Sequence, residues 1–224
     1  MGSRARPGSS GPRPRVVVIG GSRTLSVDHR WWSLLDLVRR RQGFDRVWHG
    51  ARGGADAGVA EWARTRGLPV VEFPAPRSLY REAGMPEYEA DARRNDDMLR
   101  AWGGYRSRGG SIVPCARAGG FANLVLALPP DDDTRDLVDR AERWSSIEVI
   151  KLWAPSVRWR MRCARGEATL VTRGDLAVEA DVPLRWAVGR TRAQLRRQLR
   201  GLGWAVRARE PAPEPESLDF ELHH

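Results

Sequence analysis

The chain has 224 residues, 41% of them hydrophobic and 29% charged, which is typical of a globular protein and excludes a fibrous or wholly disordered one. No apolar run approaches the roughly 20 residues of a membrane-spanning helix, and the basic segment 1–14 lacks the apolar core of a secretory signal. We therefore expect a cytoplasmic protein with no membrane partner. The formal net charge is +10, and Lys151 is the only lysine, so a basic surface for nucleic acid and an Arg-rich codon bias are both compatible with the composition.

Between residues 15 and 152, short apolar runs alternate with stretches of helical periodicity. The first run, RVVVIG at 15–20, is β-branched and ends at a glycine pair, as a strand buried on both faces does. Asp28 is expected to cap the next helix, where apolar residues recur at intervals of three and four. Further strands are predicted over 46–49, 69–73, 123–128 and 147–152, and further helices over 55–66, 86–102 and 134–144. This alternation predicts an α/β fold, with a parallel sheet that carries helices on both faces.

The remaining segments have different patterns. The glycine-rich stretch 103–120 has no periodicity and is predicted to be a long loop. After Pro155 the period changes to two, which indicates a small α+β module over 154–209. Its expected elements are strands over 157–163, 168–172, 176–182, 184–188 and 204–209, and a helix capped by Thr191 and stopped by Gly201. Segments 1–14 and 210–224 are expected to be a disordered basic tail and a disordered acidic tail.

A parallel sheet binds ligands beyond the carboxyl ends of its strands, where this sequence places two glycine-rich loops. The loop GGSRT at 20–24 allows close backbone approach and carries a charge suited to a phosphate. The loop HGARGGAD at 49–56 leads into a helix whose first N–H groups can bind an anion, with Arg52 and Gly53 beside them. His49 is expected to be a hydrogen-bonded structural histidine. A purely structural turn remains the alternative for each loop.

The motifs occur in a recognisable order: GSR after the first strand, HGxxxGAD followed by AEWARTRGLPVVEFPA, then RN with ML, ANLVLALP, and a helix headed by threonine. In this the chain resembles the YspA-related family of the SLOG superfamily, Rossmann-like proteins that include the LONELY GUY phosphoribohydrolases, lysine-decarboxylase-like proteins and, more distantly, DprA. The resemblance covers about residues 15–152. It implies a nucleotide-derived ligand, and superfamily relatives often form a homodimer. The expected ligand-binding residues are Gly21, Ser22, Arg23, Gly50, Arg52, Gly53, Gly54, Asp56, Arg94, Asn95 and Thr134.

The chain departs from the family pattern in the last of these loops. The phosphate-binding PGGxGT is replaced by PPDDDT at 129–134, where proline removes an N–H donor and aspartates repel a phosphate. Two interpretations of Asp131, Asp132 and Asp133 remain open: a site for a divalent cation such as Mg²⁺, or the N-terminal cap of a helix, which we favour. No other metal site is predicted, and no cofactor is required.

These patterns predict first a nucleotide-binding domain of the sensor or effector type. The alternative from enzyme chemistry is an N-glycosidic hydrolase, in which Arg94 orients the phosphate or ribose and Asp136 assists the departing base; the family's glutamate beside it is Leu137 here. A third candidate is a nucleic-acid-associated protein, for which a solvated surface coloured by codon bias is the competing explanation. Its cationic face would combine arginines of one strand with arginines of one helix: Arg158, Arg160, Arg162, Arg192, Arg196, Arg197 and Arg200.

Overall fold

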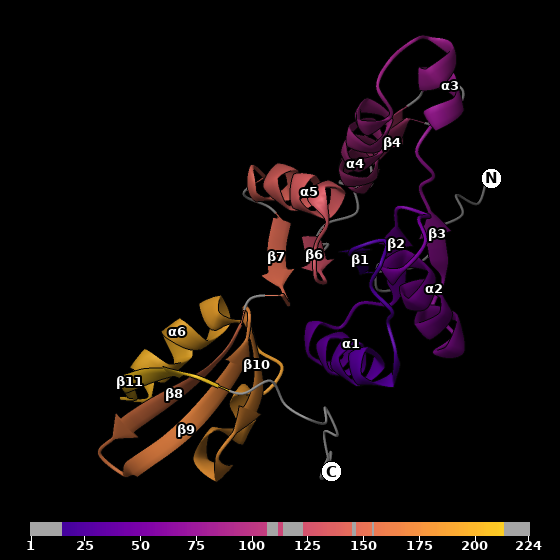
Figure 1. The fold of residues 1–224 in the computed structure, drawn as a ribbon. Coiled ribbons are helices and arrows are strands. Elements are labelled where there is room, and N and C mark those ends of the chain that lie inside the picture. The colour runs from indigo at the N-terminus through magenta and orange to yellow at the C-terminus, as the bar shows by residue number, and fades with distance from the viewer. Residues whose placement is uncertain (1–14, 107–111, 114–122, 145–146, 154, 213–224) are drawn as a thin grey trace, which may run out of the picture.

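A computed structural model describes residues 15–106, 112–113, 123–144, 147–153 and 155–212 (Figure 1). Five parallel strands form the first sheet in the order β3-β2-β1-β6-β7, which confirms the predicted Rossmann-like α/β architecture. The strands are β1 (Val16–Gly20), β2 (Arg46–His49), β3 (Val70–Glu72), β6 (Asn123–Ala127) and β7 (Ile147–Lys151). Helices α1 (His29–Gln42) and α2 (Ala55–Thr65) cover one face of the sheet, and α4 (Glu87–Gly104) and α5 (Asp132–Glu142) cover the other (Figure 1).

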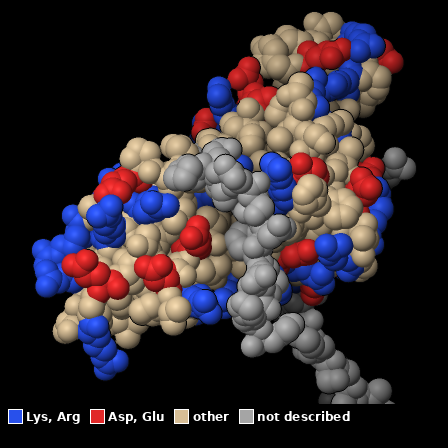
Figure 2. Space-filling model, turned by 60° about the horizontal axis from the view of Figure 1, so that its bottom comes forward, with Lys and Arg blue, Asp and Glu red and all other residues tan. Residues whose placement is uncertain are grey.

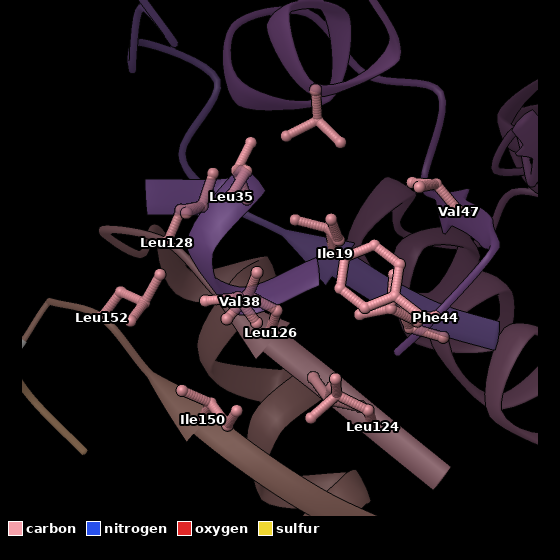
Figure 3. Close-up of a cluster of buried hydrophobic side chains, with 14 of the residues drawn as sticks. Ile19, Leu35, Val38, Phe44, Val47, Leu124, Leu126, Leu128, Ile150 and Leu152 are labelled. Atoms are coloured by element: carbon pink, nitrogen blue, oxygen red, sulfur yellow. The ribbon is translucent and has the colours of Figure 1, made fainter. Parts of the chain in front are cut away.

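The core lies between the central strands and these helices. Ile19, Leu126 and Ile150 belong to the adjacent strands β1, β6 and β7, and Leu35 and Val38 pack on them from α1 (Figure 3). All five side chains are buried, as the β-branched run and the helical periodicity predict. The helix begins where predicted, because the Asp28 carboxylate accepts the backbone N–H groups of Arg30 and Trp31.

Two elements of this domain differ from the sequence prediction. Helix α5 begins before Thr134, because its N-cap is Asp131, whose side chain accepts the Thr134 N–H. A six-residue helix, α3 (Arg77–Glu82), precedes α4 and was not predicted; it buries no side chain and so has no apolar period. Part of the predicted loop 103–120 lies outside the described residues, and its described part contains the end of α4 and the antiparallel pair β4 (Tyr105–Arg106) and β5 (Ile112–Val113).

The C-terminal module is an antiparallel sheet in the order β10-β9-β8-β11, with one helix packed on it. Its elements are β8 (Ser156–Cys163), β9 (Gly166–Arg173), β10 (Leu176–Ala180), a 3-10 helix η2 (Val182–Ala187), α6 (Arg192–Gly201) and β11 (Ala205–Pro211). The predicted strand over 184–188 is wrong, because Pro183 in the first turn of η2 favours helical geometry. Thr191 caps α6 as expected, in a reciprocal capping box with Gln194.

The module contacts the first domain through α1. The Arg173 guanidinium lies 4.5 Å from the centre of the Trp31 ring, and the Gln194 side-chain amide bonds to that of Gln42. Leu176 of β10 is fully buried in the same apolar cluster as the core of the parallel sheet. The two sheets therefore share part of one core.

None of the helices in the described ranges combines the length and the apolarity needed to cross a bilayer.

Candidate functional site

Three loops meet at the carboxyl ends of β1, β2 and β6, the point where the strand order reverses. They are the β1 loop (21–24), the β2 loop (50–54) and the β6 loop (128–131). Backbone hydrogen bonds join them directly: the Ser22 N–H donates to the Pro129 carbonyl at 2.8 Å, and the Ala55 N–H donates to the Ser22 carbonyl at 3.0 Å. Glycines allow this approach, because a Cβ on Gly21 would lie 2.6 Å from that of Ala55. This arrangement agrees with the sequence-based expectation that the glycine-rich loops lie together at one edge of the sheet.

Two arginines converge on one carboxylate at the centre of the site. The guanidinium groups of Arg52, from the β2 loop, and Arg94, from α4, both donate to Oδ2 of Asp133 in the first turn of α5. Arg52 also donates to Oδ2 of Asp131 at 2.8 Å. The Arg52 and Arg94 side chains are only 9% and 2% exposed, so these ion pairs lie largely out of water.

Further bonds hold Arg94 and its neighbour Asn95 in fixed positions. Arg94 donates to the Gly50 carbonyl at 2.9 Å and to Oδ1 of Asn95 at 3.1 Å. A Cβ on Gly50 would lie 2.5 Å from Nη1 of Arg94, so glycine is needed for this approach. The Asn95 amide then donates to the Asp133 carboxylate at 3.1 Å and to the Asp136 carboxylate at 3.0 Å. Both residues of the Arg-Asn pair are therefore bonded to α5, and Arg94 is also bonded to the backbone of Gly50.

Asp131 has the helix-cap role that the sequence favours. Its side chain accepts the backbone N–H and the hydroxyl of Thr134, and it also accepts the Arg23 N–H. Partial burial opposes ionisation of this carboxyl, but the Thr134 N–H and the Arg52 guanidinium outweigh burial and hold the pKa of Asp131 below its usual value. No group of three or more His, Cys, Asp or Glu side chains within the described ranges is arranged to hold a metal ion.

A second ion network lies at the outer rim of the site. Asp91 of α4 accepts from the Arg23 guanidinium at 3.0 Å and from the Arg77 guanidinium at 2.9 Å. Arg23 is exposed and belongs to the β1 loop, whereas Arg77 is the first residue of α3. Asp91 thereby connects the loop predicted to bind phosphate with a helix that the sequence does not predict.

Buried titratable groups flank the central ion pairs. Burial raises the pKa of Asp56 to about 6, although its carboxylate accepts the Arg52 N–H at 3.0 Å. Burial also lowers the pKa of His49, which favours the neutral imidazole, and its Nδ1 accepts the Ala51 N–H at 3.1 Å. His49, the last residue of β2, is therefore a hydrogen-bonded side chain, as predicted, and Asp56 is a carboxyl that loses hydration by folding.

Asp56→Asn is expected to remove one pH-dependent contribution to stability. Folding raises the pKa of Asp56 from 3.8 to about 6, so the native state binds more protons between these values and its stability falls as the pH rises through this window. Ionisation of the buried carboxyl then costs about 3 kcal/mol. The gap in unfolding free energy between Asp56→Asn and the wild type should shift by about this amount, in favour of the variant, between about pH 3 and pH 7.5 in urea titrations. Exposed Asp45→Asn is the control, and an unchanged gap for Asp56→Asn would contradict the assignment.

The side chains close almost completely over the site. The space that remains is about 10 Å³, which holds no more than about one water molecule. Most of the residues predicted to bind the ligand line it, and the structure adds Asp133 and Leu137; the full lining is Ile19, Gly20, Gly21, Gly50, Arg52, Asp56, Arg94, Asn95, Met98, Asp133, Thr134 and Leu137. Ser22, Arg23, Gly53 and Gly54 lie in the adjoining loops.

The two residues proposed for hydrolysis have different surroundings. Arg94 lines the space, but Asp136 is outside its lining and accepts from Arg140 of the next helical turn at 2.7 Å. The hydrogen bond to Asp136 raises the pKa of Arg140 above its usual value, so the two groups form an ion pair on the helix. Leu137, which occupies the family's glutamate position, lines the space with an apolar side chain.

The protein is therefore Rossmann-like, and the loops at the switch point of its parallel sheet lie where this class of fold binds ligands. Within that class, residues 14–80 match the YAcAr family, described as the YspA, cpYpsA-related SLOG family, and this confirms the resemblance over that range. This match to a SLOG family is consistent with a nucleotide-related ligand. The matched range contains the β1 and β2 loops, whereas Arg94 and Asp133 lie beyond it. No curated protein and no solved structure matches the chain.

Proposed function

We propose that the chain binds a nucleotide-derived ligand at the ends of β1, β2 and β6, as a sensor or effector-type domain. The observation that supports this most is the convergence of the Arg52 and Arg94 guanidinium groups on the single carboxylate of Asp133. Arginine pairs with carboxylate and phosphate oxygens in the same forked geometry. A phosphate that displaces Asp133 would thus find both donors already positioned.

Because side chains close the site almost completely, a ligand can enter only by displacing one of them. Asp133 occupies the position at which an anionic ligand group would meet the two guanidinium groups, and it acts as an internal counter-ion. Without this counter-ion, Arg94 would keep, among the described residues, only the more distant carboxylate of Asp91, at 3.9 Å, and Arg52 only that of Asp131, so two buried cations would lose part of their compensation at a cost in free energy. Ligand binding therefore requires the Asp133 side chain to leave its two partners, and the negative charge of Asp133 lowers the affinity for phosphate.

The hydrolase alternative has less support from the site. Phosphoribohydrolase-like chemistry requires a carboxyl group near the bond to be broken, but Leu137 occupies the lining at the position where the resemblance places it. The two carboxyl groups that do line the site, Asp56 and Asp133, are bonded to the Arg52 N–H and to the two guanidinium groups, respectively. Asp136 is committed to Asn95 and Arg140. Binding without turnover is therefore the function that we favour.

Ligand-induced stabilisation of the full chain tests this function. AMP, ADP-ribose and NAD are compared with adenosine, which has the same base and sugar but no phosphate, in thermal unfolding and calorimetric titration. At about a hundred times its dissociation constant, a ligand stabilises the fold by about 2.7 kcal/mol. Asp133→Asn should bind the effective nucleotide at least about tenfold more tightly, equivalent to about 1.4 kcal/mol, because the two guanidinium groups lose their competing charge.

Asp132→Asn is the matched control, since Asp132 is fully exposed and contacts only Arg135 among the described residues. Each variant is compared with its own ligand-free form, so differences in basal stability cancel. A failure of every nucleotide to stabilise the wild type and Asp133→Asn would overturn the proposed function. Equal stabilisation by adenosine would overturn the role of phosphate, and release of free base in the same mixtures would favour the hydrolase.

A further inference from the structure

The arginines of the C-terminal module lie on two different faces of its sheet. Residues of β8 alternate, so Met161 faces α6 while Arg158, Arg160 and Arg162 face the opposite side. Helix α6 packs its Leu195 onto the Met161 side of the sheet. The single cationic face expected from the sequence is therefore not formed, and its two groups of arginines have different surroundings.

The face that carries the β8 arginines is electrically mixed. Arg160 pairs with Glu210 at 3.3 Å, and Arg162 pairs with Glu167 at 3.8 Å. An open groove of about 470 Å³ on this face has lining residues of both signs: Arg158, Arg160, Glu167, Glu179 and Asp181. Figure 2 likewise shows positive and negative side chains next to one another over the C-terminal module. Such a face offers little net attraction to a polyanion.

Helix α6 has a different charge pattern. Its sequence, RAQLRRQLRG, contains no acidic residue, and Leu195 and Leu199 are buried beneath it. Arg196, Arg197 and Arg200 are exposed, and none of the three forms an ion pair with a residue in the described part of the chain. The arginines of α6 therefore differ from those of β8, which have carboxylates beside them. A general enrichment in arginine would affect both elements of the module alike and does not explain why these three α6 arginines lack carboxylate partners among the described residues.

A shallow groove adjoins the C-terminal end of α6. It has a volume of about 470 Å³, and its lining residues are Trp186, Arg190, Gln198, Gly201 and Leu202. The Arg190 guanidinium lies 5.6 Å from the centre of the Trp186 ring and is fixed by a bond from its Nε to the Trp186 carbonyl. Leu202 is 60% exposed at the groove. Arg197 lies on the same side of the helix, four residues before Gly201.

We propose that α6 and this groove form a binding surface for single-stranded nucleic acid. The exposed α6 arginines would contact successive phosphates, and an unstacked base would lie in the groove against Leu202 and the Trp186–Arg190 pair. A cationic strip beside an aromatic or planar platform is the arrangement with which proteins bind single strands without sequence preference. An acidic peptide would use the charges but not the platform, and a duplex offers no free base. This surface is separate from the strand-end site and does not depend on its ligand.

Fluorescence anisotropy of the full chain with a labelled oligothymidylate of about 12 nucleotides tests the proposal. The triple variant Arg196→Ala, Arg197→Ala, Arg200→Ala should lose at least about tenfold in affinity, and the slope of log K against log salt should become shallower by about 2, since each single-strand phosphate contact contributes about 0.7. Leu202→Ser should weaken binding at an unchanged slope, because it alters the groove but no charge.

The triple variant Arg158→Ala, Arg160→Ala, Arg162→Ala is the matched control, with the same loss of charge on the opposite face. We expect it to bind with nearly wild-type affinity. All the substituted arginines are exposed, and circular dichroism checks that each variant folds. Equal loss in both triple variants, or no loss in the α6 variant, would overturn the assignment. Competition by polyglutamate or by a duplex as strong as that by unlabelled oligothymidylate would also overturn it, in favour of an acidic protein segment or of double-stranded nucleic acid.

Discussion

Gly54→Ala is expected to cost more than about 4 kcal/mol of unfolding free energy, because it places a methyl group inside the backbone of the β1 loop. Gly54 has φ 63° and ψ −120°, a conformation that is strained for any residue with a side chain. A Cβ at this position would lie 2.1 Å from the Arg23 carbonyl oxygen and 2.7 Å from that of Ser22. The clash is with backbone atoms, which cannot rotate away, so the contact between the β1 and β2 loops must open.

Gly53→Ala is the matched control for this prediction. It changes the neighbouring glycine by the same methyl group, but a Cβ there meets no atom within 4 Å. Its backbone also lies outside the left-handed region, so we expect a change within about 1 kcal/mol, of either sign. Urea denaturation of both variants measures the difference. Similar unfolding free energies for the two variants would show that the β2 loop accommodates the methyl group and that its glycine is not a packing requirement.

The sequence predicts those parts of the fold that short-range patterns determine. The strands of the parallel sheet follow from β-branched runs such as that of β1, and the start of α1 follows from one capping side chain, Asp28. At α5 the sequence offers two capping residue types, Asp131 and Thr134, and only the hydrogen bond between them decides which one is the cap. The errors occur where the local signal is weak, in the solvent-exposed α3 and in η2, whose apolar residues are compatible with either a strand or a helix.

The site is less predictable than the fold, because its main interactions join distant residues. The glycine loops and the Arg94-Asn95 pair can be found from their motifs, but the partner of Arg52 and Arg94 is Asp133, 81 and 39 positions away respectively. No local pattern specifies which aspartate of the DDD segment turns inward. Asp91 was missed altogether, and the only signal available was its place one helical turn before Arg94. Likewise, the β8 arginines and the α6 arginines lie on opposite faces of the C-terminal sheet because of the side on which α6 packs. The alternation of residues along β8 does not determine that side.

Arg94→Met is expected to destabilise the fold by about 3–5 kcal/mol, the cost typical of removing one partner of a buried ion pair. Methionine keeps much of the unbranched aliphatic chain but has no donors. The substitution leaves the Gly50 carbonyl without its bond and leaves Asp133 with Arg52 as its remaining cationic partner among the described residues. Because the Asp133 carboxylate keeps, in the described part of the chain, only Arg52 and Asn95 to offset its desolvation, and the Gly50 carbonyl has lost its donor, the loss exceeds that of a single hydrogen bond. Urea denaturation near neutral pH measures it.

Arg93→Met makes the same chemical change one position earlier on α4. Arg93 is exposed, and its pair with Asp97 at 3.1 Å is a helical i,i+4 contact of the kind that contributes about 0.5 kcal/mol or less. A combined variant, Arg94→Met with Asp133→Asn, separates the two sources of the loss: removal of the carboxylate should recover part of the stability, because no charge is then left buried without its partner. If the double variant were less stable than Arg94→Met by the full effect of Asp133→Asn alone, the two residues would act independently. Asp133 would then not be the counter-ion of Arg94, and its release would not be needed to free this guanidinium for a phosphate.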